Sequence, residues 1–197
     1  MEIRIHHNIS AMTKGLNDLQ RREIPRATAR ALNRVADQAK TQASREIRKR
    51  YNVAARAVGA AIALKRASPS ALQARLSATG KAIKLYAFGA RGKPGRPVTV
   101  EVIKGQRKVV PGAFIITTKS GHKGVFARGK YGASGFQFRK RRTRKGSKHD
   151  LPITELVSIS VPRAFGAKVV IQALQKLVRD KFEGIFANEL AFRLGRL

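Results

Sequence analysis

The sequence predicts an α+β fold in which long N-terminal and C-terminal helices flank a central antiparallel β-sheet with extended basic loops. Two observations predict the helices: apolar residues recur every three or four positions over residues 26–50 and again after Pro162. A third predicts the sheet, because several short central segments alternate apolar and polar residues between turns. Their close spacing favours antiparallel pairing over βαβ units. We expect residues 1–197 to form a single domain.

The N-terminal helices are expected over residues 24–61. Pro25 suits the first helical turn, where its missing N–H group is not needed. The positions that follow at helical spacing and form the inner face are Thr28, Leu32, Val35, Ala39, Ala43 and Ile47. Many are alanine, which allows a partner helix to approach closely. A short second helix is expected from Val53 to about Ala60, with Asn52 as its N-cap.

The central strands are expected within residues 62–128. The segments that alternate apolar and polar residues, or that are rich in strand-forming residues, are 72–78, 82–86, 98–103, 113–118 and 124–128. Turn residues occur at 68–70 and at 104–106. After this sheet, we expect residues 129–150 to form a basic mobile loop, because a dense run of like charges cannot bury itself.

Residues 151–197 are expected to form one more strand, over 156–161, and then the C-terminal helix that Pro162 opens. The apolar stripe of this helix comprises Phe165, Val169, Leu174, Leu177, Val178, Phe182, Ile185, Phe186 and Leu190. The stripe has two interpretations, an intramolecular core and a contact with a neighbouring copy. Because the apolar surface is large for a domain of this size, we predict an oligomer interface at Phe182, Ile185, Phe186 and Leu190.

The charge of the chain is its most informative bulk property. There are 42 Lys and Arg residues against 11 Asp and Glu residues, which gives a formal net charge of +31. Between Ile47 and His149 there are 26 basic residues and one acidic residue, Glu101, so this central part carries +25. Such repulsion destabilises a compact monomer unless a partner neutralises it. A phosphate backbone is the first candidate, an anionic membrane surface the second and an acidic protein the third.

Two basic loops are the candidate sites of nucleic-acid binding. Residues 89–97 contain three glycines and two prolines, but they lack the spacing of a phosphate-binding P-loop. Residues 129–150 contain a run of six charges in seven positions. Tyr131, Phe136 and Phe138 precede this run, and they either stack on bases or anchor the loop on the core. The predicted phosphate-binding residues are Arg91, Lys93, Arg96, Arg139, Lys140, Arg141, Arg142, Arg144, Lys145 and Lys148.

Several kinds of chemistry are not expected. The chain has no cysteine, which excludes disulfides and thiolate metal sites. Its four histidines lack the spacing of helical zinc ligands, and one central carboxylate does not make a paired-carboxylate site. Serine-nucleophile, zinc-finger, homeodomain and RNA-recognition signatures are absent. We therefore expect no enzyme activity, no metal, no cofactor and no membrane span, and only sequence-independent binding of nucleic acid.

Five short segments follow one another in a characteristic order. They are LNRVA at 32–36 leading to SREI at 44–47, KVVPGAFI at 108–115, HKGVFAR at 122–128 and LPI at 151–153. In their order and in the extreme basicity, the chain resembles the prophage minor tail protein Z family of long-tailed phages over nearly its whole length. The glycine-rich arm at 129–149 is long for that family.

The resemblance implies a structural virion protein that completes the tail at its head-proximal end, near the tail terminator and other tail or neck proteins. It implies no enzyme activity and no cofactor, a location in the virion tail or neck, and the host cytoplasm during assembly. The sixfold symmetry of tails implies a hexameric ring, whose basic lumen would hold phage double-stranded DNA without reading bases. The charge alone leaves an alternative open, a general nucleic-acid-binding protein of ribosomal or nucleoid type.

Overall fold

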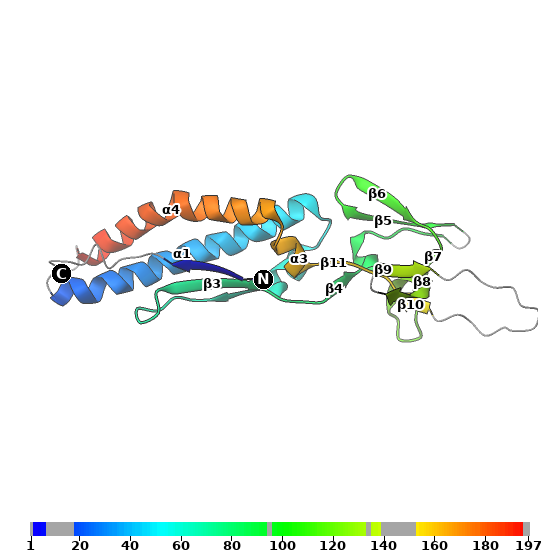
Figure 1. Ribbon diagram of the computed structural model, residues 1–197, viewed down its shortest axis with the longest axis horizontal. Coiled ribbons are helices and arrows are strands. Elements are labelled where there is room, and N and C mark those ends of the chain that lie inside the picture. Colours follow the sequence, from blue (N-terminus) through cyan, green and yellow to red (C-terminus); the bar gives the residue numbers. More distant parts are fainter. Residues whose placement is uncertain (1, 7–17, 94–95, 133–134, 139–152, 195–197) are drawn as a thin grey trace, which may run out of the picture. The chain divides into compact units, whose positions relative to one another are not determined.

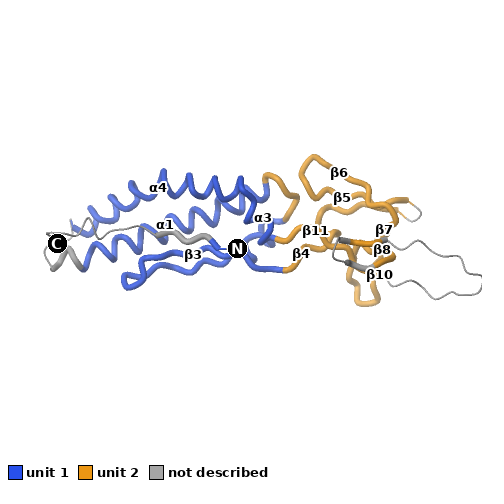
Figure 2. The backbone as a smooth tube through the Cα atoms, viewed as in Figure 1, with its two compact units in different colours: residues 1–48, 54–80, 161–197 blue, residues 49–53, 81–160 orange. Residues whose placement is uncertain are grey.

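The computed structural model describes residues 2–6, 18–93, 96–132, 135–138 and 153–194 (Figure 1). Long helices near both ends of the chain and antiparallel strands between them confirm the predicted α+β class. The chain, expected to form a single domain, gathers its contacts into two compact units (Figure 2). Unit 1 comprises residues 1–48, 54–80 and 161–197, and unit 2 comprises residues 49–53 and 81–160. Each unit has its own apolar core.

Unit 1 combines helices with a small sheet. Its helices are α1 (Asp18–Arg50, whose last two residues belong to unit 2), α2 (Ala55–Ala61), α3 (Val161–Phe165) and α4 (Lys168–Leu194). Its antiparallel strands, in spatial order, are β1 (Glu2–His6), β3 (Gln73–Ala78) and β2 (Ile62–Lys65). Helices α1 and α4 run side by side, with the sheet next to α1 (Figure 1).

The core of unit 1 forms where α1 meets α4 and the sheet. Leu32 and Val35 of α1 are fully buried, and they cluster with Phe182 of α4 and Ala74 of β3. Burying a Leu or Val side chain stabilises the fold by roughly 1.5–3 kcal/mol relative to exposing it. As predicted, much of the buried face of α1 is alanine, so neighbouring elements approach its backbone closely.

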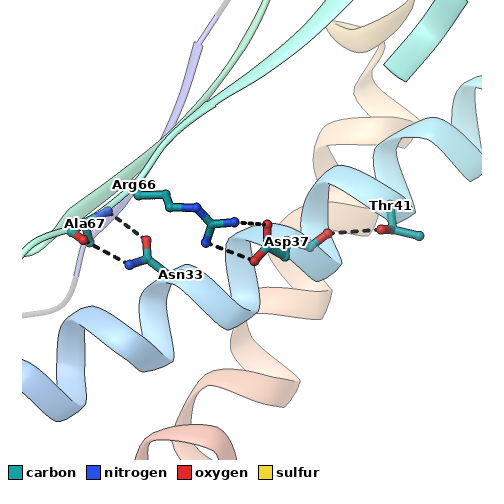
Figure 3. Close-up of polar contacts among 5 residues, drawn as sticks. All are labelled: Asn33, Asp37, Thr41, Arg66 and Ala67. Atoms are coloured by element: carbon teal, nitrogen blue, oxygen red, sulfur yellow. Dashed lines mark hydrogen bonds and ion pairs between the residues drawn. The ribbon is translucent and has the colours of Figure 1, made fainter. Parts of the chain in front are cut away.

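Polar contacts attach the end of β2 to α1 (Figure 3). The side-chain amide of Asn33 donates to the carbonyl oxygen of Ala67 at 2.9 Å, and its oxygen accepts from the Ala67 N–H group at 2.8 Å. One turn along α1, the carboxylate of Asp37 accepts two hydrogen bonds from the Arg66 guanidinium, each 3.0 Å long. Because Ala67 is buried, its backbone N–H and C=O groups lose their hydrogen bonds with water on folding. The Asn33 amide replaces both of these hydrogen bonds.

Unit 2 consists of antiparallel strand pairs around a second core. Its strands are β4 (Ala82–Lys84), β5 (Val98–Ile103), β6 (Gln106–Val110), β7 (Ala113–Thr117), β8 (Lys123–Gly132), β9 (Gly135–Phe138), β10 (Ile153–Glu155) and β11 (Val157–Ser160). Strand β4 pairs with β11, β5 with β6, and β8 with β7, β9 and β10. A 3-10 helix, η1 (Leu85–Phe88), places Phe88 in the core beside Val98 and Val125.

The N-terminal helices differ from the prediction at their starts. Helix α1 begins at Asp18, so Pro25 lies inside it rather than in its first turn. Proline removes one helical hydrogen bond, and the burial of Ile24 and Ala27 on either side offsets that local cost. Helix α2 begins at Ala55 without a capping side chain. The predicted cap at Asn52 is wrong, because this residue's N–H group donates to a backbone carbonyl of β5 instead.

The predicted C-terminal helix is divided in two. Gly166 and Ala167 separate α3 from α4. The break changes which residues face inward: Val169 is 60% exposed, whereas Val170 is buried. The rest of the predicted stripe keeps its helical spacing, and Leu174 and Phe182 are buried.

Strands also form where the sequence patterns predict none. Strand β1 alternates polar and apolar residues but has only five of them, β2 has four residues, and β6 is almost wholly exposed. Part of the predicted loop at 129–150 is a hairpin of β8 and β9. At Gly129 φ is 147°, and a Cβ atom would lie 2.1 Å from the carbonyl oxygen of Gln137, so the hairpin requires glycine there. Residues 139–150 lie outside the described residues.

Candidate nucleic-acid interface

A basic groove lies in unit 2, where residues 90–93, 96 and 97 meet the β7–β8 hairpin. It is open to solvent and has a volume of about 610 Å³. Four cations line it together with one tyrosine and several small or apolar residues: Arg91, Lys93, Arg96, Lys123, Tyr86, Ala90, Gly92, Pro97, Ile115 and Thr117. All four cations are exposed. We call this feature the basic groove.

Backbone pairing brings the two sides of the basic groove together. Arg91 exchanges two hydrogen bonds with Thr99 of β5, of 2.9 and 2.8 Å, which fixes the first side. Lys123 pairs with Thr117 at the turn end of the β7–β8 hairpin, which fixes the second side. Gly92 lies so close to β5 that a Cβ atom would be 3.1 Å from a methyl group of Val98. The small residue therefore lets the first side pack against β5.

The cations of the basic groove have no ion-pair partner among the described residues. Other cations of unit 2 occupy the carboxylates near them: Lys84 binds Glu155 at 2.9 Å, and Arg107 binds Glu101 at 3.3 Å. Because no described carboxylate neutralises these cations, the groove keeps a positive potential that attracts anions.

Glu155 forms a charged cluster with Lys84 and with His122, the residue that precedes Lys123. One of its carboxylate oxygens lies 2.7 Å from Nε2 of His122, and the other lies 2.9 Å from Nζ of Lys84. Burial favours the neutral form of Glu155, but hydrogen bonds and charges from Lys84 and His122 outweigh it. They hold the pKa of this carboxyl below its usual 4.5, so Glu155 is ionised at neutral pH.

The structure places three of the predicted phosphate-binding residues together. Arg91, Lys93 and Arg96 line the basic groove side by side. The other seven predicted residues lie outside the described part of the chain: Arg139, Lys140, Arg141, Arg142, Arg144, Lys145 and Lys148. Sequence reasoning misses Lys123 and Tyr86, because only the pairing of distant strands shows that they face the same groove.

Of the predicted aromatic and interface residues, Phe136, Phe182, Ile185 and Phe186 pack in or against the cores, and the side chains of Tyr131 and Phe138 lie outside the described part of the structure. Phe136 is partly buried and packs against the core of unit 2, which supports anchoring over base stacking. Phe182 lies in the core of unit 1, with its ring centroid 6.0 Å from that of Phe186. Ile185 packs against the same core, and Leu190 is partly buried. A role of these α4 residues in an oligomer interface stays a prediction.

The family of the chain can be assigned from the whole sequence. A family model of prophage minor tail protein Z matches residues 9–194. The chain belongs to this family. No curated protein and no solved structure matches it significantly. Minor tail protein Z is a structural protein of phage tails, so the chain is a virion tail component whose partners are other tail proteins.

The segments that resemble minor tail protein Z have structural roles. In LNRVA, Leu32 and Val35 fill the core of unit 1, Asn33 binds the backbone of Ala67, and Arg34 binds Glu189 at 2.8 Å. In KVVPGAFI, Gly112 has a φ of 70° and turns the chain into β7. The described residues of LNRVA and KVVPGAFI thus help to build the scaffold.

The described residues contain neither a candidate membrane span nor a candidate metal site. No helix there is both long and apolar enough to cross a bilayer. No three His, Cys, Asp or Glu side chains in this part of the chain gather as metal ligands would.

Proposed function

We propose that this minor tail protein is a tail-completion or neck component at the head-proximal end of the tail, where it contacts genomic double-stranded DNA. The observation that carries the proposal is the basic groove, in which the side chains of Arg91, Lys93, Arg96 and Lys123 are exposed and form no ion pair with the described residues. Family membership makes the protein a component of a phage tail, and the positive charge of the groove is a reason for it to bind a polyanion there.

The chemistry of the basic groove suits phosphate groups rather than base edges. Its described lining contains guanidinium and ammonium groups, which bind phosphates, and no amide or carboxylate side chain that would read adenine or cytosine. Tyr86, 37% exposed, offers one aromatic surface to a sugar or base. Contacts of this kind hold a nucleic acid of any sequence, as passage of a whole genome through a tail requires.

Assembly of several copies requires a partner that neutralises their charge. A net charge of +31 on each copy opposes assembly unless DNA or acidic neighbours neutralise it. We propose a hexamer, in keeping with the symmetry of tails, that stands next to the tail terminator with its basic grooves toward the lumen. Such a ring assembles in the host cytoplasm and needs no membrane.

Localisation within particles tests this proposal. Gold-labelled antibody against an epitope tag on the chain should mark the head-proximal end of purified tails and the neck of virions. Tails made without the protein should have normal length but should fail to join heads. Label at the distal tip, or co-sedimentation of the protein with ribosomes instead of particles, would contradict the proposal.

A further inference from the structure

A polar cavity on unit 1 is separate from the basic groove. It has a volume of about 300 Å³ and lies among α1, the end of β2 and α4. Six polar residues line it: Arg30, Asn33, Arg34, Asp37, Arg66 and Glu189. Figure 3 shows three of these residues, Asn33 and Asp37 of α1 and Arg66 after β2, with their hydrogen bonds. We call it the arginine cavity.

The arginine cavity has hydrogen-bond donors left over for an anion. Arg66 binds Asp37 with both terminal nitrogens, and Arg34 binds Glu189 with one. Arg30 has no ion pair or hydrogen bond among the described residues, and it lies four residues from Arg34 on the same face of α1. Two like charges at this spacing destabilise a helix, so an anion between them would relieve a local cost.

A single carboxylate suits this cavity better than nucleic acid does. The carboxylates of Asp37 and Glu189 line the cavity, and their negative charges would repel a continuous row of phosphates. A small anion can approach Arg30 and the free donors of Arg34 while it avoids both acidic residues. The ligand that fits is therefore an acidic side chain of a neighbouring protein.

The chain itself offers such side chains on α4. Asp180 and Glu183 are exposed, and they are the carboxylates without any partner among the side chains that the structure describes. Lys176 and Arg179 each precede one of them by four residues, which is the weaker order for a helical ion pair, and no such pair forms. In a chain with 42 basic residues, two free carboxylates on one helix face are unusual.

The positions of these groups exclude a contact within one copy. Asp180 precedes Glu189 by nine residues, about two and a half helical turns, so the two lie on opposite sides of α4. Glu183 lies one turn from Asp180, on the same side. The acidic pair therefore faces away from the arginine cavity of its own copy. When a surface on one side of a subunit binds a cavity on the opposite side of the next subunit, the subunits join head to tail. Such a contact closes into a ring if the rotation from one subunit to the next permits it.

We propose that Asp180 and Glu183 of one copy dock at the arginine cavity of the next copy, with Arg30 as their main partner. This inference rests on the proposed ring and names a contact that joins its subunits. Arg30 is the decisive residue, because its replacement breaks no hydrogen bond or ion pair with the residues that the structure describes. Arg34 and Arg66 hold the cavity in shape through their own ion pairs.

Charge reversal on the full-length protein tests the contact. Mass photometry and sedimentation velocity at about 150 mM salt should show that Arg30→Glu raises the apparent dissociation constant of the oligomer at least tenfold. Asp180→Arg with Glu183→Arg should have a similar effect. The combined variant Arg30→Glu, Asp180→Arg, Glu183→Arg should recover assembly, because both sides of the contact are reversed.

Arg45→Glu is the matched control, since it makes the same charge change on an exposed residue of α1 outside the cavity. Circular dichroism confirms that each variant is folded. If wild-type protein forms oligomers and Arg30→Glu assembles as Arg45→Glu does, the contact is wrong while the ring stands. If wild-type protein stays monomeric with or without duplex DNA, both the contact and the ring are wrong. Failure of the combined variant to recover also overturns the contact.

Discussion

At the scale of single residues, Glu189 is the most buried carboxylate that the structure describes. Its side chain is 5% exposed, and its partner Arg34 is 67% exposed. Removing Arg34 would leave a charge in a site that water hardly reaches, whereas removing Glu189 would leave a guanidinium that water solvates. The two halves of this pair therefore contribute unequally to stability.

We predict that Arg34→Ala lowers the free energy of unfolding by about 1–3 kcal/mol, because the Glu189 carboxylate loses its partner. In a Glu189→Gln background the same change should cost close to nothing. Urea unfolding of the wild type, the two single variants and the double variant measures the coupling. An equal cost of Arg34→Ala in both backgrounds would mean that the ion pair does not stabilise the protein.

At the scale of elements, ion pairs tie short strands together. Glu155 of β10 joins Lys84 of β4 to His122, which precedes β8. Hydrogen bonds and charges lower the pKa of Glu155 despite its partial burial. A carboxyl with a lowered pKa stabilises the fold above its unfolded pKa, and it loses that contribution as the pH falls through the folded pKa.

We predict that Glu155→Gln lowers the melting temperature at pH 7 by about 2–4 °C, the shift expected for a loss of about 1 kcal/mol. The difference from wild type should shrink below about pH 4.5, where the wild-type carboxyl also becomes neutral. Melting curves between pH 3 and 7 measure it. Lys119→Gln, which removes a charge that does not titrate in this range from an exposed residue of unit 2, is the control. A difference that does not vary with pH would show that the ion pairs do not cause the effect.

The elements that sequence patterns predict are those whose burial is regular. Helix α1 and strands β3, β5 and β7 have a buried face with a period of 3.6 or 2, so their positions could be predicted. Strand β6 could not, because its residues are exposed and only its hydrogen bonds with β5 make it a strand. The start of α1 at Asp18 also differs from the predicted start near Pro25. Burial of Ile24 and Ala27 around Pro25 outweighs the preference of proline for the first turn of a helix.

At the scale of the whole molecule, the division into two units could not be predicted. Unit 1 is assembled from three separate stretches of chain, and no linker composition marks their borders. The basic groove was predictable in part. Arg91, Lys93 and Arg96 stand out by local composition, whereas Lys123 joins them through the pairing of β7 with β8, a contact between distant residues.

We expect the basic groove to bind the phosphate backbone of duplex DNA. The affinity should then depend strongly on salt, and four residues should contribute to this dependence: Arg91, Lys93, Arg96 and Lys123. Their replacement by alanine should be compared with a control that loses the same charge at exposed, unpaired positions of unit 1, namely Arg45, Arg56, Lys168 and Lys176.

Fluorescence anisotropy with labelled duplex DNA between about 50 and 200 mM salt is the most direct measurement. If each groove cation neutralises one phosphate, the slope of log affinity against log salt should fall by about 3.6 in the groove variant, which removes about 150-fold of the salt effect. The control variant should keep most of the wild-type slope. Equal slopes in the two variants, or no binding of DNA by the wild type, would contradict the claim.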